Sequence, residues 1–333
     1  MPAIHRRCAA KTLATASLAL WLQRPLQGFA AEDPTASGSD GDGKTNPPLP
    51  YLDRLGLQLY TVRQQMADDP ETTLQAVADA GYKQVELMQV NDAAVGLAAI
   101  ARDKGLIVHS AFIDFNVIAE PTLQGVASVE QTLELAERIG LRHVVFGYIA
   151  RHQRDTADKC KAIADRANDA ARKTREAGMR MCYHNHAFEF APLEPTGQTG
   201  DDSNPPAQKG KSSVTAFDLF TQRFDPQVME FELDVFWARL AGKNPLELMK
   251  RLSGRISQVH LKDLKAGVPV IFDEGKVPRD AFQEIGDGII DMPDVMRLAR
   301  EIGVDQCHVE QDQSPAPLAS IRESADYLLG NAS

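Results

Sequence analysis

The sequence lacks three features that would each have indicated a class of protein. Outside the first eleven residues it has no cluster of Lys and Arg, and its formal net charge is −10. Because binding to nucleic-acid phosphates needs grouped basic side chains, no nucleic-acid partner is expected. No apolar run reaches the roughly 20 residues that span a bilayer, so no membrane partner is expected once the N-terminal segment is removed.

Cysteine is also scarce. Of the four cysteines, Cys8 lies in the N-terminal segment, which leaves Cys160, Cys182 and Cys307, an odd number with no CxxC spacing. This count argues against a disulfide framework. Cys182 and Cys307 fall in predicted strands, where a free cysteine behaves as a small buried apolar residue.

The first 31 residues have the pattern of an export signal. A charged start that ends at Lys11 precedes an apolar run of about 11 residues and a small-residue cleavage site at Gly28-Phe29-Ala30. The pair Arg6-Arg7 before Lys11 resembles a twin-arginine signal; an ordinary secretory signal and a short membrane anchor are the alternatives. We therefore expect a periplasmic or secreted protein.

Residues 32–50 are rich in Asp, Ser, Gly, Thr and Pro and have no apolar periodicity. They are predicted to be a disordered linker between the signal and a catalytic domain at 51–333. In the whole chain, 43% of the residues are apolar and 25% are charged, which is typical of a globular protein with a sizeable core.

Within this domain, short apolar runs alternate with segments of helical spacing that often end at Gly. The predicted strands are 55–60, 84–87, 107–111, 143–146, 180–184, 230–234, 256–262 and 308–310, and the predicted helices are 70–80, 93–104, 126–139, 155–177, 214–224, 245–252, 292–302 and 319–329. Eight such units predict a (β/α)₈ TIM barrel. The alternative, a doubly wound open sheet, lacks its GxGxxG turn, since Tyr60-Thr61-Val62-Arg63 follows the first strand.

Two connections are long enough to cover a substrate. Both 192–213 and 264–291 follow predicted strands and so lie on the active-site face of a barrel. Gly286 and Gly288 in the second either place backbone amides near an anion or form a plain turn.

Several predicted strands end in a carboxylate or an imidazole. The strongest candidates are Asp234, His260 and Glu310, on the sixth, seventh and eighth strands. Because the strand ends of a barrel meet at one face, these groups point to a shared divalent metal. Oxygen and imidazole donors with open positions suit Mn²⁺, Co²⁺, Mg²⁺, Fe²⁺ or Zn²⁺ and do not separate them.

Six motifs together resemble the xylose isomerase-like barrel superfamily, and within it the sugar phosphate isomerase/epimerase branch. The resemblance covers about residues 55–330, and it implies a metal held by residues of the last four strands, here Asp234, His260 and Glu310 plus one from the fifth strand. The motifs are Leu57-Gln58-Leu59-Tyr60-Thr61-Val62-Arg63, Gly81-Tyr82-Lys83-Gln84-Val85-Glu86-Leu87, Tyr183-His184-Asn185-His186-Ala187-Phe188-Glu189-Phe190, Leu233-Asp234-Val235-Phe236-Trp237, Val259-His260-Leu261-Lys262-Asp263 and Val309-Glu310-Gln311-Asp312.

The fifth strand departs from the family pattern. Many relatives have a glutamate where this chain has His184. Either His184 is the fourth ligand or Glu189 folds back to serve; His184 is favoured because it lies on the strand. In the alternative, His184 and His186 only hydrogen-bond substrate or carboxylates.

The chemistry that the resemblance implies is proton transfer next to a carbonyl, which needs a metal and a base. Glu86, His186 and Lys262 are the predicted catalytic residues, Lys262 as a cation that polarises or anchors oxygen. His109, Glu189 and Trp237 are the predicted substrate-binding residues, although His109 fits a core histidine equally well. Phe236 and Trp237 offer an apolar wall, and ordinary packing is the alternative for each.

We therefore expect a metal-dependent isomerase or epimerase acting on a small-molecule carbohydrate, sugar or keto-sugar. The first alternative is a lyase or dehydratase on keto-sugars or 3-keto-glycosides, and the second is a non-catalytic periplasmic sugar-binding protein. The exported location favours unphosphorylated sugars. Endonuclease activity is disfavoured by the acidic net charge, and an oligomer is compatible with the sequence.

Overall fold

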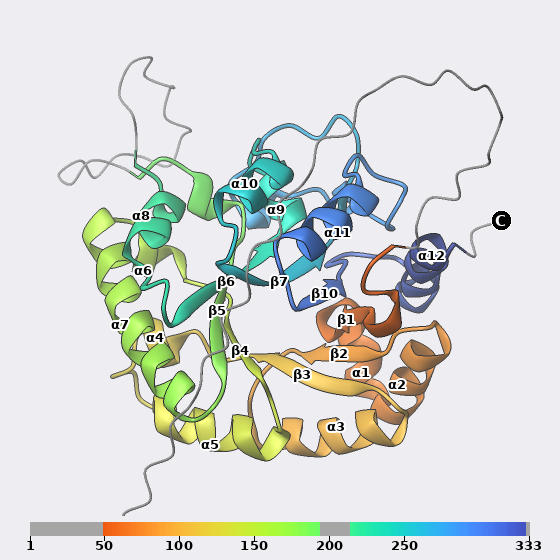
Figure 1. The fold of residues 1–333 in the computed structure, drawn as a ribbon, viewed down its shortest axis with the longest axis horizontal. Coiled ribbons are helices and arrows are strands. Elements are labelled where there is room, and N and C mark those ends of the chain that lie inside the picture. The colour runs from red at the N-terminus through yellow and green to blue at the C-terminus, as the bar shows by residue number, and fades with distance from the viewer. Residues whose placement is uncertain (1–48, 194–213, 331–333) are drawn as a thin grey trace, which may run out of the picture. The chain divides into compact units, whose positions relative to one another are not determined.

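The computed structural model describes residues 49–193 and 214–330. The predicted export signal, nearly all of the predicted linker and most of the 192–213 connection lie outside the described residues. The described chain forms a closed parallel barrel in the order β1-β10-β7-β6-β5-β4-β3-β2, which confirms the predicted fold (Figure 1). Its strands are β1 Gly56–Gln58, β2 Gln84–Leu87, β3 Ile107–Phe112, β4 His143–Phe146, β5 Arg180–His184, β6 Met229–Asp234, β7 Ile256–Leu261 and β10 Gln306–Val309.

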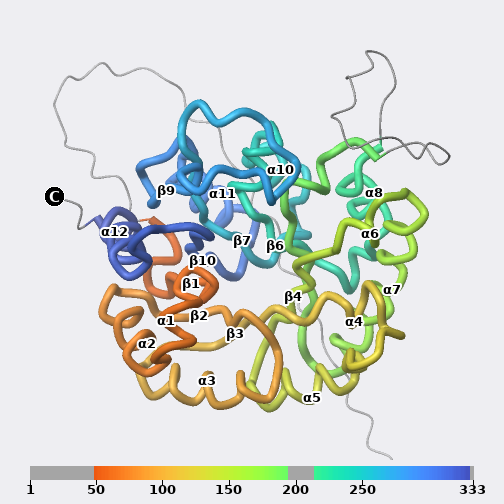
Figure 2. Tube along the Cα trace, turned by 180° about the vertical axis from the view of Figure 1, so that it is seen from behind, coloured from red at the N-terminus to blue at the C-terminus, as the bar shows by residue number. Residues whose placement is uncertain are grey.

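Helices surround this barrel, and α2, α3, α5 and α7 follow one another around its outside in both views (Figures 1 and 2). None of the described helices is long and apolar enough to cross a bilayer. The helices are α1 Arg63–Asp68, α2 Pro70–Asp79, α3 Asp92–Asp103, α4 Asn116–Ala119, α5 Val129–Ile139, α6 Arg151–Arg154, α7 Ala157–Glu176, α8 Ala216–Arg223, α9 Val235–Leu240, α10 Pro245–Arg251, α11 Met292–Glu301 and α12 Pro317–Leu329.

Capping side chains set where the helices begin. The helix predicted from residue 126 starts at Val129, because Ser128 and Gln131 form a capping box. The helix predicted from 155 starts at Ala157, because the Thr156 side chain accepts from the backbone N–H of Lys159. Apolar periodicity alone does not place these starts, because it carries no information on capping side chains.

The first strand is shorter than predicted. β1 ends at Gln58, whose side-chain oxygen accepts a hydrogen bond from the backbone N–H of Tyr60 at 2.9 Å. The chain therefore turns into the 3₁₀ helix Leu59–Val62 instead of continuing as a strand. Lys262 and Glu310 likewise lie just beyond β7 and β10, although both were predicted within strands.

The long connection after β7 contains a small antiparallel hairpin, β8 Asp263–Leu264 with β9 Phe282–Gln283. The buried carboxylate of Asp263 accepts hydrogen bonds from the backbone N–H groups of Leu264, Gly286, Gly288 and Ile290 at 2.8–3.2 Å. A Cβ on Gly288 would lie 2.1 Å from Asp263 Oδ1, so only glycine permits this approach. The anion held by the amides of Gly286 and Gly288 is thus a side chain of the protein.

The barrel interior is polar as well as buried. The apolar core packs mainly between strands and helices, whereas side chains that point into the barrel include Gln58, Glu86, Ser110, Glu232, Gln258, His260 and His308, each with at most 2% of its surface exposed. Cys160, Cys182 and Cys307 are free and buried, and for Cys182 and Cys307 this burial was predicted. Polar groups in such a place need partners, and these interior residues make up the candidate site and its support.

Candidate active site and metal centre

A cavity of about 590 Å³ opens at the carboxyl ends of the strands. Its wall is formed by residues at or after the ends of all eight barrel strands, including Tyr148 after β4, His186 after β5, Trp237 in α9 and Phe282 in β9. This is the face of a barrel on which active sites lie. The connection after β7, predicted to cover a substrate, supplies five of the lining residues, from Glu274 to Phe282.

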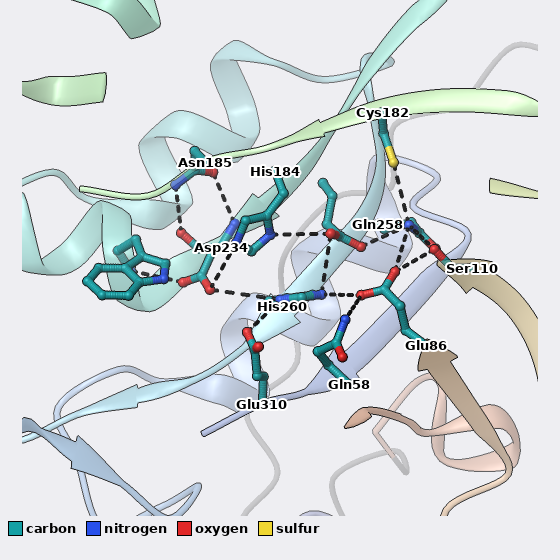
Figure 3. A network of polar contacts seen from close by, with 12 residues as sticks. Gln58, Glu86, Ser110, Cys182, His184, Asn185, Asp234, Gln258, His260 and Glu310 are labelled. Atoms are coloured by element: carbon teal, nitrogen blue, oxygen red, sulfur yellow. Dashed lines mark hydrogen bonds and ion pairs between the residues drawn. The ribbon is translucent and has the colours of Figure 1, made fainter. Parts of the chain in front are cut away.

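Four predicted metal ligands converge in a network of polar contacts (Figure 3), and two of them, His184 and Glu310, line the cavity. His260 Nδ1 lies 2.9 Å from Glu310 Oε2 and 3.9 Å from Asp234 Oδ2. His184 Nε2 lies 4.0 Å from the same Asp234 oxygen. Two donors that share one cation at about 2.0–2.2 Å can be no more than about 4.4 Å apart. All three separations satisfy this limit, and among the described residues His184, Asp234 and His260 form a group whose donor atoms lie close enough together to hold a metal ion. Glu310 adjoins this group through its hydrogen bond with His260.

The backbone around Asp234 fixes where its carboxylate points. Asp234 is the N-cap of α9, and its Oδ1 accepts from the backbone N–H of Trp237 at 2.9 Å, which leaves Oδ2 toward the histidines. Asn185 exchanges hydrogen bonds with the backbone of Asp234 at 3.1 and 3.3 Å. The Asn between His184 and His186 therefore ties the end of β5 to the end of β6.

Lys262 is the cation that accompanies these carboxylates. Its ammonium lies 3.1 Å from Asp234, 2.6 Å from Glu310 and 2.6 Å from Asp312, with 1% of the side chain exposed. Although burial opposes its charge, Asp234, Asp312 and Glu310 raise the pKa of Lys262 well above its ordinary value. Lys262 is therefore positively charged and cannot serve as a base in this state.

A second layer of polar side chains lies beneath the four donors. Glu86 Oε1 lies 2.8 Å from His260 Nε2, and Glu232 Oε2 lies 3.4 Å from the same nitrogen. Gln258 Nε2 donates to Glu232 at 2.8 Å and lies 3.4 Å from Glu86. The Ser110 hydroxyl also donates to Glu86. Within the described residues, Glu86, Glu232, His260 and His308 form a second group whose atoms lie close enough to hold a metal.

The charges of the two layers differ because their surroundings differ. Burial, together with the charge of His260, lowers the pKa of His184 well below its ordinary value, so this ring is neutral. Burial opposes protonation of His260 as well, but Glu232 and Glu310 raise its pKa well above the ordinary range. Burial and then the charge of Glu86 raise the pKa of Glu232. Despite burial, His308 and His260 lower the pKa of Glu86 to about 2.

His186 and Trp237 form one wall above the ligands. Their rings lie 5.2 Å apart, and His186 stacks on Phe188 at 5.3 Å. Burial and then the charge of Lys262 lower the pKa of His186 to about 3. The predicted base is therefore a neutral imidazole on the cavity wall, 5.0 Å from the ring of His184.

Besides the fully buried Asp234 and His260, three more predicted site residues do not line this cavity. Glu86, predicted to be catalytic, is fully buried one layer below, against His260. His109 lies on the opposite face of β3 from Ser110 and Phe112, beside Arg142. Glu189 turns away, because the Tyr183 hydroxyl donates to it at 2.5 Å and the His186 backbone N–H at 2.9 Å. Of the two candidates for the fourth ligand, His184 is thus the one placed beside Asp234.

Sequence reasoning missed two acidic residues near the site. Glu232 precedes Asp234 by two residues and so shares its face of β6, a signal that the alternation of a strand provides. Asp312 lines the cavity and pairs with Lys262. Burial raises the pKa of Asp312 to about 6, although the charge of Lys262 opposes this shift. No strand pattern reaches Asp312, because it lies beyond β10.

Residues 74–329 match the sequence profile of the family described as xylose isomerase-like TIM barrel. Among curated proteins, the inosose dehydratase of Geobacillus kaustophilus (strain HTA426) is 27% identical over 186 residues, 53% of this chain and 54% of that protein. The inosose dehydratase of Clostridium beijerinckii is 26% identical over 167 residues, 48% of this chain and 49% of that protein. The chain thus spans about half the length of the curated relatives that it matches.

Solved structures share the fold over most of the chain. A sugar phosphate isomerase/epimerase from Parabacteroides distasonis ATCC 8503 matches with a TM-score of 0.67 and 22% identity, over 86% of this chain and 98% of that one. The 3-keto-D-glucoside 4-epimerase YcjR from E. coli matches with a TM-score of 0.56 and 12% identity, over 83% and 98%. At these identities the likeness shows the fold alone.

Proposed function

Because the chain belongs to the family of xylose isomerase-like TIM barrels, we propose that it is a metal-dependent enzyme that removes a proton next to the carbonyl of a sugar or keto-sugar. The observation that carries the proposal is the convergence of donor atoms from His184, Asp234, His260 and Glu310 beneath the cavity. The names of its relatives, isomerases, epimerases and dehydratases, support an enzyme of this group.

The four converging residues would hold the cation, whose identity among Mn²⁺, Co²⁺, Mg²⁺, Fe²⁺ and Zn²⁺ the donor set leaves open. When bound, such a cation supplies Lewis-acid stabilisation of the negative charge that develops on a carbonyl oxygen. The ammonium of Lys262, beside Asp234 and Glu310, adds positive charge at the same place. Both effects lower the cost of removing an α-proton in a site shielded from water.

An imidazole nitrogen of His186 accepts the proton in this proposal. The ring lines the cavity and is neutral, so it has a lone pair available at neutral pH. Trp237 and Phe282 form apolar wall that excludes water from the reacting carbon. Glu86, which lies below His260, supports that ring instead of contacting the substrate.

The first form of the proposal is an isomerase or epimerase. Return of the proton to the neighbouring carbon gives an isomerase, and return to the opposite face of the same carbon gives an epimerase. Loss of a neighbouring hydroxyl or glycosidic substituent after the same first step gives a lyase, and the dehydratase names of the curated relatives favour this second form. Their substrate, an inosose, is a cyclic polyhydroxy ketone, and the cavity of about 590 Å³ has room for a ring of that kind.

Incubation of the metal-loaded protein with ketoses, inososes and 3-keto-glycosides in deuterated water tests both forms. Deuterium in recovered sugar without elimination supports the isomerase or epimerase, and release of water or aglycone supports the lyase. Sugar binding without any α-proton exchange contradicts both and supports a non-catalytic binding protein.

We also propose that the protein is exported, on the strength of the N-terminal pattern around Arg6 and Arg7. Fractionation of cells that express the full chain, with Arg6→Lys and Arg7→Lys together as the comparison, tests the route. Retention of the double variant in the cytoplasm supports twin-arginine export, and equal export of both proteins contradicts that route.

A further inference from the structure

Tyr60 is an exposed aromatic residue in the wall of the cavity. It lies just beyond β1, in the 3₁₀ helix Leu59–Val62, whose other residues Leu59, Thr61 and Val62 are buried. Its exposed fraction is 42%, and among the described residues it is the one exposed large apolar side chain that also lines the cavity. A single exposed ring is ordinary on a protein surface, but a ring in a cavity wall offers contact area to a ligand.

The ring of Tyr60 is held in place from one side. The guanidinium carbon of Arg63 lies 4.1 Å from the ring centroid, within the range of a cation–π interaction. The backbone is fixed as well, because the Tyr60 N–H donates to Gln58 Oε1 at 2.9 Å and Arg63 Nη1 donates to the Tyr60 carbonyl at 2.8 Å. A ring that is already fixed binds a ligand at a low cost in conformational entropy.

Tyr60 lies apart from the donor atoms of the candidate metal centre. β1 runs parallel to β10 with Leu57 beside Val309, which brings Gln58 level with Glu310, and Tyr60 follows Gln58 by two residues. The cavity of about 590 Å³ is also larger than one ring needs. Pockets of about 300–1,000 Å³ bury ligands of drug size, which have more atoms than a single sugar ring. A keto-sugar ring at the donor atoms therefore leaves room for a second group beside Tyr60.

We propose that Tyr60 forms an outer subsite for a second ring of the substrate, so that the protein acts on ring-bearing glycosides of a keto-sugar in preference to free ketoses or inososes. The second ring stacks on the side of Tyr60 that Arg63 leaves uncovered, while the keto-sugar ring stays at the donor atoms. The inference rests on the proposed function, which places the keto-sugar there, and it applies to both forms of that function.

The test compares Tyr60→Ala with Tyr60→Phe, which keeps the ring, and with Tyr327→Ala. Tyr327, in α12, is exposed to a similar extent, 40%, but does not line the cavity. Calorimetry measures the affinity of metal-loaded protein for phenyl and methyl β-D-glucosides, which lack a keto group and so do not react. We expect the wild type to bind the phenyl glucoside about 2–10-fold more tightly, with this preference lost in Tyr60→Ala and kept in the other two variants.

Equal affinity of the wild type for the two glucosides, or no binding of either, would overturn the inference. A preference that persists in Tyr60→Ala, or that Tyr327→Ala also loses, would overturn it too. Should Tyr60→Ala fail to fold, Tyr60→Leu, which keeps an apolar side chain without a ring, replaces it with the same expected loss.

Deuterium exchange into the corresponding 3-keto-glucosides reports separately on the proposed function. A preference for the phenyl group without any exchange or elimination contradicts the proposed function and leaves the outer subsite of Tyr60 to a binding protein. Exchange or elimination without that preference supports the proposed function and overturns the outer subsite.

Discussion

Two pairs of carboxylates lie at or just after strand ends of the same barrel but have different partners. Asp234 and Glu310 converge with histidines beneath the cavity, and Asp234 has only one oxygen bound to a backbone N–H. Asp263 and Glu189 are equally close to strand ends, but backbone N–H groups of their own loops donate to them. A carboxylate whose oxygens are bound by backbone N–H groups therefore stabilises its loop, whereas one that keeps an oxygen free of them can bind a metal ion.

The largest effect is expected from Asp234→Asn. Asn keeps the size of the side chain and the cap on Trp237 but removes the charge and leaves the amide group toward the histidines. Because a donor of the proposed cation is lost, we expect metal content to fall to background and activity to drop by more than the roughly 100-fold typical of an outer partner. Mass spectrometry of the purified protein and a rate assay measure the two. Full metal content in this variant would show that the site is elsewhere.

A large loss of stability with intact metal binding is expected from Asp263→Asn. An amide cannot accept from all four backbone N–H groups that the carboxylate of Asp263 now binds. Each buried N–H without an acceptor costs about 1–3 kcal/mol, so we expect the free energy of unfolding to fall by about 2–4 kcal/mol. Urea denaturation measures this loss, and metal analysis is the control. A stable variant that loses its metal would reverse the comparison with Asp234.

Glu189→Gln should change the pH dependence of stability. Burial raises the pKa of Glu189 from 4.5 to about 7, although the Tyr183 hydroxyl opposes the shift. The folded state then binds the proton more tightly than the unfolded state, so the wild type is relatively most stable below pH 4.5 and loses this contribution as the pH rises to 7. Gln does not titrate. We therefore expect the free energy of unfolding of Glu189→Gln, relative to that of the wild type, to rise by up to about 3 kcal/mol over that interval.

The measurement for Glu189 is the difference in free energy of unfolding between the two proteins at pH 4.5, 6 and 8. A difference that stays constant with pH would mean that the carboxylate remains ionised and fully satisfied. A difference that grows toward low pH would contradict the assigned direction.

The smallest effect is expected at Glu274, a carboxylate on the cavity wall that nevertheless has partners. The Tyr148 hydroxyl donates to it at 2.9 Å, and Arg154 lies 3.3 Å away. Tyr148→Phe removes one of these bonds, for which we expect a loss of about 0.5–1.5 kcal/mol and a rise in KM with little change in kcat. Thermal unfolding and steady-state kinetics check both. A fall in kcat alone would give Tyr148 a part in the chemical step.

The sequence predicted the barrel because each strand and helix has its own period, and that period survives in the fold. It also predicted Asp234, His260 and Glu310 as site residues, since polar side chains at the ends of apolar barrel strands meet at one face of the barrel. It assigned no role to Asp263, because the amides of Gly286 and Gly288 that bind this carboxylate come from a loop more than 20 residues away. The role of Glu189 was left open for a similar reason. The bend of the chain after β5, which the sequence does not show, brings Glu189 to the hydroxyl of Tyr183.

Of the lower layer, the sequence predicted Glu86 as a site residue but not its partners Gln258 and Ser110, for a different reason. Gln258 and Glu232 stand inside strands, where a polar residue in an alternating pattern normally faces solvent. Only closure of the barrel turns that face inward and brings Gln258, Glu86 and Ser110 together from three strands. Closure depends on the whole sheet, so the pattern of a single strand cannot show which polar side chains it brings together.

The most direct test of the account is a crystal structure of the protein soaked with Mn²⁺, with anomalous scattering used to find the ion. The account predicts one peak within bonding distance of His184, Asp234, His260 and Glu310, at the floor of the cavity. A peak among Glu86, Glu232 and His308 in the lower layer, or no peak in the barrel, would contradict it.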